Sequence, residues 1–570
     1  MILAALVKRY ENQAAEGKIS RRDWSKADVS FGLRLNEEGK VADLIDLRTE
    51  EKRGKKISLA DRKIEVPEQA GKTSKIMSNF LCDKADYILG ISGNIERFEA
   101  AKKLHQEILS NCKSATANAV KNFFANWQPS ETENCSALQN YLDDLKKGSK
   151  IIFMFEENFI CEDEEIKIAW ENFQQNQTES TLMQCPIIGK ILPVAETHPL
   201  IKGVRNAHKA GAAIVSFNAP AFESYEHKQN LNSAVSKYAA FAYTTALNDL
   251  LSDSEHVKFF GDMTVVYWAE ENSEECQNVV AELLEPNDDT ISNETLNILI
   301  KGIQEKNLNF KETKLDYENP FYILGLSPNS GRLSVRFFLK NNLGEVVKNI
   351  AKHYEDIKII KPAFKKFENI PLWQILAATV SPKSKDKSAA PLMSGAVVRA
   401  VFTGGKYPFS LLQNAILRVK SEHEITYERA AIIKGYLTRN KGRENLVALD
   451  ENFNDRNYIL GRIFSVLEAI QAAANPNLNS TIKDKYFTSA CTAPNRILPN
   501  LQKLSIHHLK KLELGQKIYF EKQLGNLMNR LSPIEQNAAT LTLEEQGMFI
   551  LGYYHQTQER YKTKEEKKNG

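Results

Sequence analysis

Near residue 343 the spacing of apolar residues changes from that of strands to that of helices, and this change limits the folds open to the chain. Before it, Val29, Phe31, Leu33 and Leu35 alternate with polar or small residues, the two-residue period of a half-buried strand. After it, apolar residues recur at helical spacing. The sequence therefore predicts an α+β protein: a mixed N-terminal α/β region with antiparallel hairpins, followed by an all-α C-terminal helical bundle.

The N-terminal region contains one predicted helix and two predicted hairpins. Residues 2–16 keep one helical face apolar and end at Gly17, a common residue at helix ends. A strand over 29–35 leads through a turn ending at Gly39 into a strand over 41–47. Further strands are expected at 151–155, 213–217, 264–268 and 321–326, the last turning at 328–331 into a strand over 333–339.

With 570 residues the chain is too long for one hydrophobic core, since cores stop growing at roughly 250–300 residues. The later helical patterns are separated by breaks such as Asn475-Pro-Asn477 and Ser532-Pro533. We expect three domains: an N-terminal α+β domain over 1–342, a basic helical connecting region over 343–446 and a C-terminal helical bundle over 447–570.

The net charge of +3 hides a strong partition along the chain. Residues 332–446 carry 21 Lys and Arg against 9 Asp and Glu, whereas residues 131–316 carry 15 against 31. A long basic tract favours a polyanion partner such as nucleic acid. The alternative is a solvated helical face, and charge alone does not separate the two.

The composition also excludes several classes of protein. Apolar runs such as Ile2–Val7 are far shorter than the roughly 20 residues of a membrane-spanning helix. This run precedes the first basic residues, the reverse of a secretory signal, so we expect a cytoplasmic protein without membrane contact. The seven cysteines form no Cys-x-x-Cys clip, and neither a disulfide framework, a metal site nor a cofactor is predicted.

Catalytic motifs are also missing. Gly71-Lys72-Thr73 resembles the end of a phosphate-binding loop, but that loop needs glycine where the chain has Val66. The acidic run 162–165 and the glutamates near 270–275 have no histidine beside them, which favours a solvated acidic face. We expect no enzyme. The alternative function is a metal-dependent nuclease that uses scattered carboxylates.

Three polar segments stand out against this background: 71–83, 198–204 and 215–225. They combine hydroxyl, amide, lysine and aromatic side chains, and small residues. Such segments suit close approach to a nucleic acid groove, where amide and hydroxyl groups can bond base edges.

Together with other segments, they resemble one protein family along the whole chain. The segments are the opening Met-Ile-Leu-x-Ala-Leu-Val, Val66–Gln69 with Asn79–Asp83, the Val-Ser-Phe-Asn-x-x-Ala-Phe-x-Ser-Tyr stretch from Val215, Ala240–Leu247, Phe321–Asn329 and Gly547–Gln556. In this order they resemble the large subunit of the type I-C CRISPR Cascade. One departure is Glu226, where the family commonly has glycine, which puts a tight turn there in question.

The resemblance implies a non-catalytic subunit that recognises the protospacer-adjacent motif in target DNA, promotes duplex opening, stabilises the displaced non-target strand and helps recruit the helicase-nuclease. Implied partners are the crRNA-containing Cascade with its backbone and crRNA-end-binding subunits, small subunits equivalent to the chain's own C-terminal bundle, double-stranded target DNA and the displaced single strand. Base pairing then reads the long sequence, and the protein reads a short motif, groove shape and backbone. A pure assembly scaffold would leave the basic tract without a role.

Two sets of DNA-contacting residues follow. The residues expected to line the duplex entry and read the motif are Lys72, Thr73, Ser74, Lys75, Asn79, Phe80, Ser216 and Asn218. Among them, Phe80 is either a wedge that stacks where the first base pair opens or a core residue. The cations expected along the displaced strand are Lys361, Lys365, Lys366, Lys383, Lys385, Lys387, Arg399, Lys406, Arg439, Lys441 and Arg443.

The resemblance also implies a second product, a small subunit translated from an internal start. The chain has no methionine between Met393 and Met528. Such a start would therefore use the codon of Leu446 or Val447, after the break at 439–443. The alternative is an ordinary domain made only as part of the full chain.

Overall fold

The change in periodicity near residue 343 coincides with the junction of strand β17 (Arg332–Asn342) and helix α10 (Leu343–Ile357). There the Asn342 side chain accepts a hydrogen bond from the Glu345 backbone and caps the helix. The computed structural model describes residues 1–19, 21–53, 56–69, 76–91, 93, 95–176, 181–271, 274–286, 308–310, 313–365, 369–385, 388–444, 446–476, 478–531 and 540–561. Contacts divide the chain into two compact units, residues 1–201 with 215–249 (unit 1) and residues 202–214 with 250–570 (unit 2).

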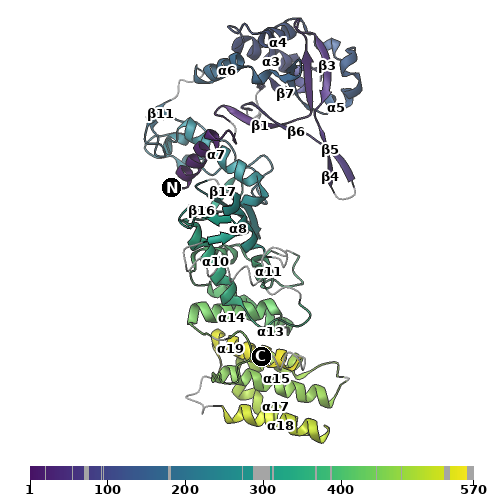
Figure 1. The fold of residues 1–570 in the computed structure, drawn as a ribbon, viewed down its shortest axis with the longest axis vertical. Helices are drawn as coiled ribbons and strands as arrows, with labels where there is room; N and C mark the ends of the chain where they lie inside the picture. The colour runs from purple at the N-terminus through teal and green to yellow at the C-terminus, as the bar shows by residue number, and fades with distance from the viewer. Residues whose placement is uncertain are drawn as a thin grey trace. The chain divides into compact units, whose positions relative to one another are not determined.

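Unit 1 combines short strands with helices (Figure 1). Its strands are β1 (Trp24–Val29), β2 (Phe31–Leu35), β3 (Val41–Asp46), β4 (Thr49–Arg53), β5 (Lys56–Ala60), β6 (Arg62–Pro67), β7 (Cys82–Lys84), β8 (Lys150–Phe155), β9 (Asn158–Phe159), β10 (Leu182–Gln184) and β11 (Ile191–Pro193). Its helices are α1 (Ile2–Ala15), α2 (Ala85–Ile88), α3 (Ile95–Ile108), α4 (Ala115–Asn126), α5 (Leu142–Lys146), α6 (Glu164–Asn176) and most of α7 (Lys237–Ser252).

The main sheet of unit 1 has the strand order β3-β2-β8-β7, with β9 added to β8. Strands β2 and β3 form the predicted hairpin, and β8 lies parallel to β2. Their alternate apolar residues, such as Phe31, Leu33 and Phe153, join Phe123 of α4 in one hydrophobic cluster. Burial of this face therefore fixes the pairing of the strands.

Unit 2 begins with strands and continues as helices. Its strands are β12 (Val257–Phe260), β13 (Met263–Ala269), β14 (Leu308–Phe310), β15 (Thr313–Leu315), β16 (Pro320–Asn329) and β17. Its helices are α8 (Glu274–Leu284), α10, α11 (Leu372–Ala377), α12 (Pro391–Thr403), α13 (Phe409–Glu422), α14 (Tyr427–Lys441), α15 (Arg456–Ala474), α16 (Ile482–Thr492), α17 (Pro494–Leu509), α18 (Leu514–Asn529) and α19 (Leu543–Tyr561).

Strands β12, β13, β16 and β17 form an antiparallel sheet in that order. Strand β17 pairs with β16 through the predicted hairpin, but the register shifts where Gly325 pairs with Phe337 and Leu326 with Val335. Arg336 therefore has no cross-strand partner and is the extra residue of a β-bulge. Bulges turn a side chain away from its normal direction.

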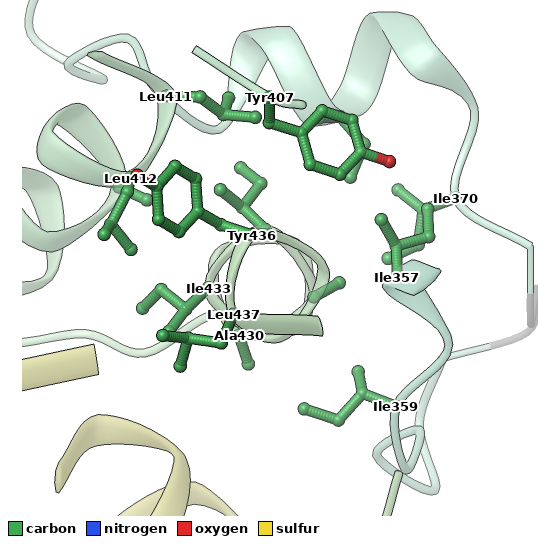
Figure 2. Close-up of a cluster of buried hydrophobic side chains, with 14 of the residues drawn as sticks. Ile357, Ile359, Ile370, Tyr407, Leu411, Leu412, Ala430, Ile433, Tyr436 and Leu437 are labelled. Atoms are coloured by element: carbon green, nitrogen blue, oxygen red, sulfur yellow. The ribbon is translucent and has the colours of Figure 1, made fainter. Parts of the chain in front are cut away.

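The helices of unit 2 enclose α14. Figure 2 shows α14 along its axis, with Ile357, Leu411 and Tyr407 from other parts of the chain around Ile433 and Leu437. All five belong to one hydrophobic cluster that continues through the C-terminal helices. At Gly547 of α19, an added Cβ would lie 3.0 Å from a methyl carbon of Ile433. The α19 helix therefore packs closely against α14.

The predicted α+β class is confirmed, with small sheets followed by a helical region. The predicted strand over 213–217 is wrong. Only Ala213 pairs there, in an isolated bridge with Arg332, and the loop soon reaches Pro220, which has no N–H to donate to a ladder. The three predicted domains stay a prediction. No helix in the described ranges has the length and hydrophobicity needed to cross a membrane.

Candidate nucleic-acid interface

The segment after β6 is closed at its base by two amide side chains. The Asn79 side chain donates to Gln69 Oε1 over 3.0 Å, and Gln69 Nε2 donates to the carbonyls of Pro67 and Cys82. The backbone N–H of Asn79 also donates to Asp83 over 2.8 Å. Asn79 is 5% exposed. Its bond to Gln69, called the bracket below, joins the two ends of the connection between β6 and β7. The predicted residues Lys72, Thr73, Ser74 and Lys75 lie inside this connection and outside the described residues.

Phe80 lies in the core of unit 1. Its side chain is fully buried and stacks on Trp170 with ring centroids 5.4 Å apart. The next residue, Leu81, donates its backbone N–H to His105 Nε2 over 2.9 Å. Burial lowers the pKa of His105 to about 4, which keeps the imidazole neutral and able to accept this bond. Of the two alternatives, Phe80 is therefore a core residue and not a wedge. Its buried ring packs against Trp170 and His105 and has no free face for a base.

The second predicted motif segment ends in a tight turn. Tyr225 and Glu226 both have positive φ, at 51° and 61°, and His227 donates its backbone N–H to the Ser224 carbonyl. Asn232 braces both sides of the turn, since it accepts from the Ser224 backbone and donates to the carbonyl of His227. The tight turn expected to be in question at Glu226 therefore forms with a non-glycine residue there. Ser216 is half-buried and Asn218 is exposed on the preceding loop.

His198 anchors the same loop from inside unit 1. Asn230 donates to His198 Nε2 over 2.6 Å, so His198 Nδ1 carries the proton and donates to the Tyr243 hydroxyl, also over 2.6 Å. Burial lowers the pKa of His198 to about 4. The polar segment over 198–204 thus contributes an internal hydrogen-bond network here rather than a free histidine.

The predicted strand-binding cations fall into three groups. Lys366 and Lys387 lie outside the described residues, and Lys361 is half-buried. Three of the cations form ion pairs: Lys365 with Glu428, Lys441 with Glu544 and Arg443 with Asp455. The exposed members for which the described residues provide no such ion pair are Lys383, Lys385, Arg399 and Lys406.

Arg439 is the buried exception. Its side chain is 3% exposed and pairs with Asp356 of α10 over 2.5 Å. Nη1 donates to the Ala400 carbonyl at the end of α12, and the guanidinium carbon lies 4.3 Å from the centre of the Tyr407 ring. A group held in this way supports α12 and the turn after it. We therefore correct the prediction of a direct phosphate contact at Arg439 to a supporting role.

Arg399 and Lys406 line one groove, of about 460 Å³, that follows α12. Its lining includes small residues of α12, among them Gly395, Ala396 and Ala400, and also Arg336 from the bulge in β17. None of the lining residues is acidic. Arg336 was not among the predicted contacts, because a bulge depends on the register between two strands.

The carboxylates considered for a nuclease have structural partners. Glu165 accepts from the backbone N–H groups of Lys113 and Ser114, which lowers its pKa. Glu270 accepts from the Tyr322 hydroxyl. Within the described ranges, no group of three or more His, Cys, Asp and Glu side chains is placed to hold a metal ion. These residues therefore provide no support for the nuclease alternative.

Comparison with known proteins identifies the family. A search of curated proteins finds no match. The family model described as CRISPR-associated protein (Cas_Csd1) matches residues 6–561, which is nearly the whole chain and includes both the bracketed segment after β6 and the groove along α12. The chain therefore belongs to the Csd1 family of CRISPR-associated proteins, the large subunit of the type I-C Cascade.

Proposed function

We propose that this Cascade subunit recognises the protospacer-adjacent motif of target DNA through unit 1, promotes duplex opening, and stabilises the displaced strand through the basic tract of unit 2. The observation that carries the proposal is the family match over residues 6–561. The complex finds its target by base pairing with the guide, so the protein needs to read only a short motif and the backbone.

The bracket at Gln69 and Asn79 supports motif recognition by the connection between β6 and β7. Hydrogen bonds join Asn79 to Gln69 and to Asp83, which holds the two ends of the connection together. Lys72 and Lys75 lie between those ends and carry donors for phosphates and groove acceptors. The exposed Asn218 of the second loop adds an amide that can bond a base edge.

Motif discrimination by the assembled complex tests this part. Binding of duplexes with a correct and an altered motif is compared for wild type, Lys72→Ala with Lys75→Ala, and Asn218→Ala. A lost base contact reduces discrimination by about 1–3 kcal/mol. Lys103→Ala, an exposed lysine on α3, is the matched control and leaves discrimination unchanged. Wild-type discrimination in both test variants would contradict the assignment.

We also propose that the gene yields a short product that begins near residue 447 and serves as a small subunit. In the full chain the Ile360 backbone donates to the Val447 carbonyl, and α19 packs against α14. The product would leave this face of α19 to be covered by another subunit. Mass spectrometry of the complex expressed from its own gene tests the idea, and the absence of any product starting near 447 rejects it.

Helicase-nuclease recruitment forms the last part of the proposal. It rests on family membership alone, and no single surface of the described residues is assigned to it. Pull-down of the helicase-nuclease by the assembled complex with and without target DNA tests it.

A further inference from the structure

We infer that the groove along α12 binds the phosphate backbone of a single polynucleotide strand through Arg336, Arg399 and Lys406. This inference rests on the proposed strand-holding role and adds to it the site and its ligand. It also adds Arg336, which lies on a β-bulge, to the predicted strand contacts. The buried Arg439 is given a positioning role instead of a contact with the strand.

The charges of the groove fit a polyanion. Arg336, Arg399 and Lys406 are all exposed, and among the residues that the structure describes no carboxylate forms an ion pair with any of them. The groove is lined without a single acidic residue. Lys441 and Arg443 of the same tract, which do not line the groove, differ in this respect because they pair with carboxylates. Three uncompensated cations around one groove attract successive phosphates.

The shape of the groove favours one strand over a duplex. Its volume of about 460 Å³ lies in the range of small-molecule sites and can take part of one strand. Small lining residues, such as Gly395 and Ala396, let a backbone come close. Leu392 is 78% exposed at one end and offers an apolar contact to a base, which in a single strand is unpaired and available.

Several contacts hold the C-terminal end of the groove rigid. Gly404 ends α12 at a φ of 68°, and an added Cβ would lie 2.5 Å from the Asn349 side chain. The Asn440 side chain donates to the Tyr407 carbonyl and accepts from its N–H. In the sequence, Lys406 lies between Gly404 and Tyr407, which these contacts hold in place. Arg439 donates to the carbonyl of Ala400, another lining residue of the groove. Arg439 is thus a positioning residue for the groove.

The test measures binding of the full-length chain to a fluorescent oligothymidine at several salt concentrations. Replacing Arg336, Arg399 and Lys406 together by Gln removes three phosphate contacts. Each contact to a single strand contributes about 0.7 to the slope of log K against log salt, so the slope falls by about 2. The control, Lys103→Gln with Lys113→Gln, removes two exposed cations of unit 1 that lie outside the basic tract and leaves the slope unchanged.

Arg439→Lys separates positioning from contact. Lysine keeps the positive charge beside Asp356 but lacks the planar fork that also reaches the Ala400 carbonyl. A positioning role predicts weaker binding with an unchanged salt slope. A direct phosphate contact would be kept by lysine, which carries the same charge, so wild-type affinity in this variant would overturn the positioning role.

Three results would overturn the groove assignment: a wild-type slope in the triple variant, an equal loss of slope in the control pair, or stronger competition by polyglutamate than by unlabelled oligothymidine. The last would indicate an acidic protein partner. Motif discrimination by complexes carrying the same variants is measured in parallel. Because the groove variants leave unit 1 unchanged, failure of motif recognition is distinguishable from failure of the groove.

Discussion

The segment around Asn79 in unit 1 and the groove along α12 in unit 2 were both predicted to contact DNA, but the structure uses their polar groups differently. Asn79 and Asp83 are buried and bond other parts of the same protein. Arg399 and Lys406 are exposed in a groove without acidic residues. A polar side chain is available to a ligand only where the fold leaves it exposed and unsatisfied, and burial separates these two cases.

The largest expected effect is on stability in acid, and it applies to both units. Burial lowers the pKa to about 4 for His105 and His198 in unit 1, and to about 3 for His353 and His555 in unit 2. Each unfolded histidine takes up a proton below pH 6.5 while the folded one stays neutral. The stabilisation is therefore complete above pH 6.5 and is lost as pH falls from there towards the folded pKa, at about 1.4 kcal/mol per pH unit and histidine.

Thermal unfolding at pH 7.0, 6.0 and 5.0 measures this loss. His198→Gln removes one titrating group, so its melting temperature should fall less steeply with pH than that of wild type. Equal melting temperatures at pH 7.0 and 5.0 would contradict neutral buried histidines in either unit.

The next largest effect is a difference in stability between a variant of Arg439 and a variant of Arg399. Arg439→Met removes the buried partner of Asp356 and leaves only its ion pair with the exposed Lys352, which costs up to about 3–5 kcal/mol. Arg399→Met changes an exposed side chain on α12, and such substitutions stay within about 0.5 kcal/mol. Urea denaturation of the two variants tests the contrast, which similar midpoints would refute.

A smaller effect is expected at the bracket of unit 1. Asn79→Ala removes the bond to Gln69 and leaves a half-buried acceptor, at a cost of about 1–3 kcal/mol. If the bracket positions the connection that reads the motif, discrimination by the complex also falls. Ser78→Ala, which removes a longer bond of 3.4 Å to Asp83, is the control. Unchanged stability of Asn79→Ala would show that the bracket contributes nothing.

The smallest effect concerns the turn at Tyr225 and Glu226. Glu226→Gly places glycine at a position with φ of 61°, where it has no steric cost. The relief of strain is partly offset by the greater freedom of glycine in the unfolded chain. The expected result is a net stabilisation of up to about 1 kcal/mol, measured by urea denaturation. Glu223→Gly, outside the two positive-φ positions, is the control and should destabilise or leave stability unchanged.

Local sequence determined much of the fold. The hairpin from β16 to β17 followed from alternation and from the turn at Asn329–Gly331, because both signals involve residues adjacent in the chain. The helical character of the chain after residue 343 followed from periodicity for the same reason. The family followed from segments spread along the chain, and the match over residues 6–561 confirms it.

The tertiary structure decided which polar and aromatic residues remain accessible. Phe80 is in the core because Trp170, 90 residues later, stacks on it. Arg439 is buried because Asp356 of another helix reaches it. Arg336 joins the groove because of a bulge in the β16 and β17 register. Each outcome depends on contacts between residues far apart in the sequence or on pairing register, so residue type and local periodicity determine the elements, and packing determines which side chains are left to bind.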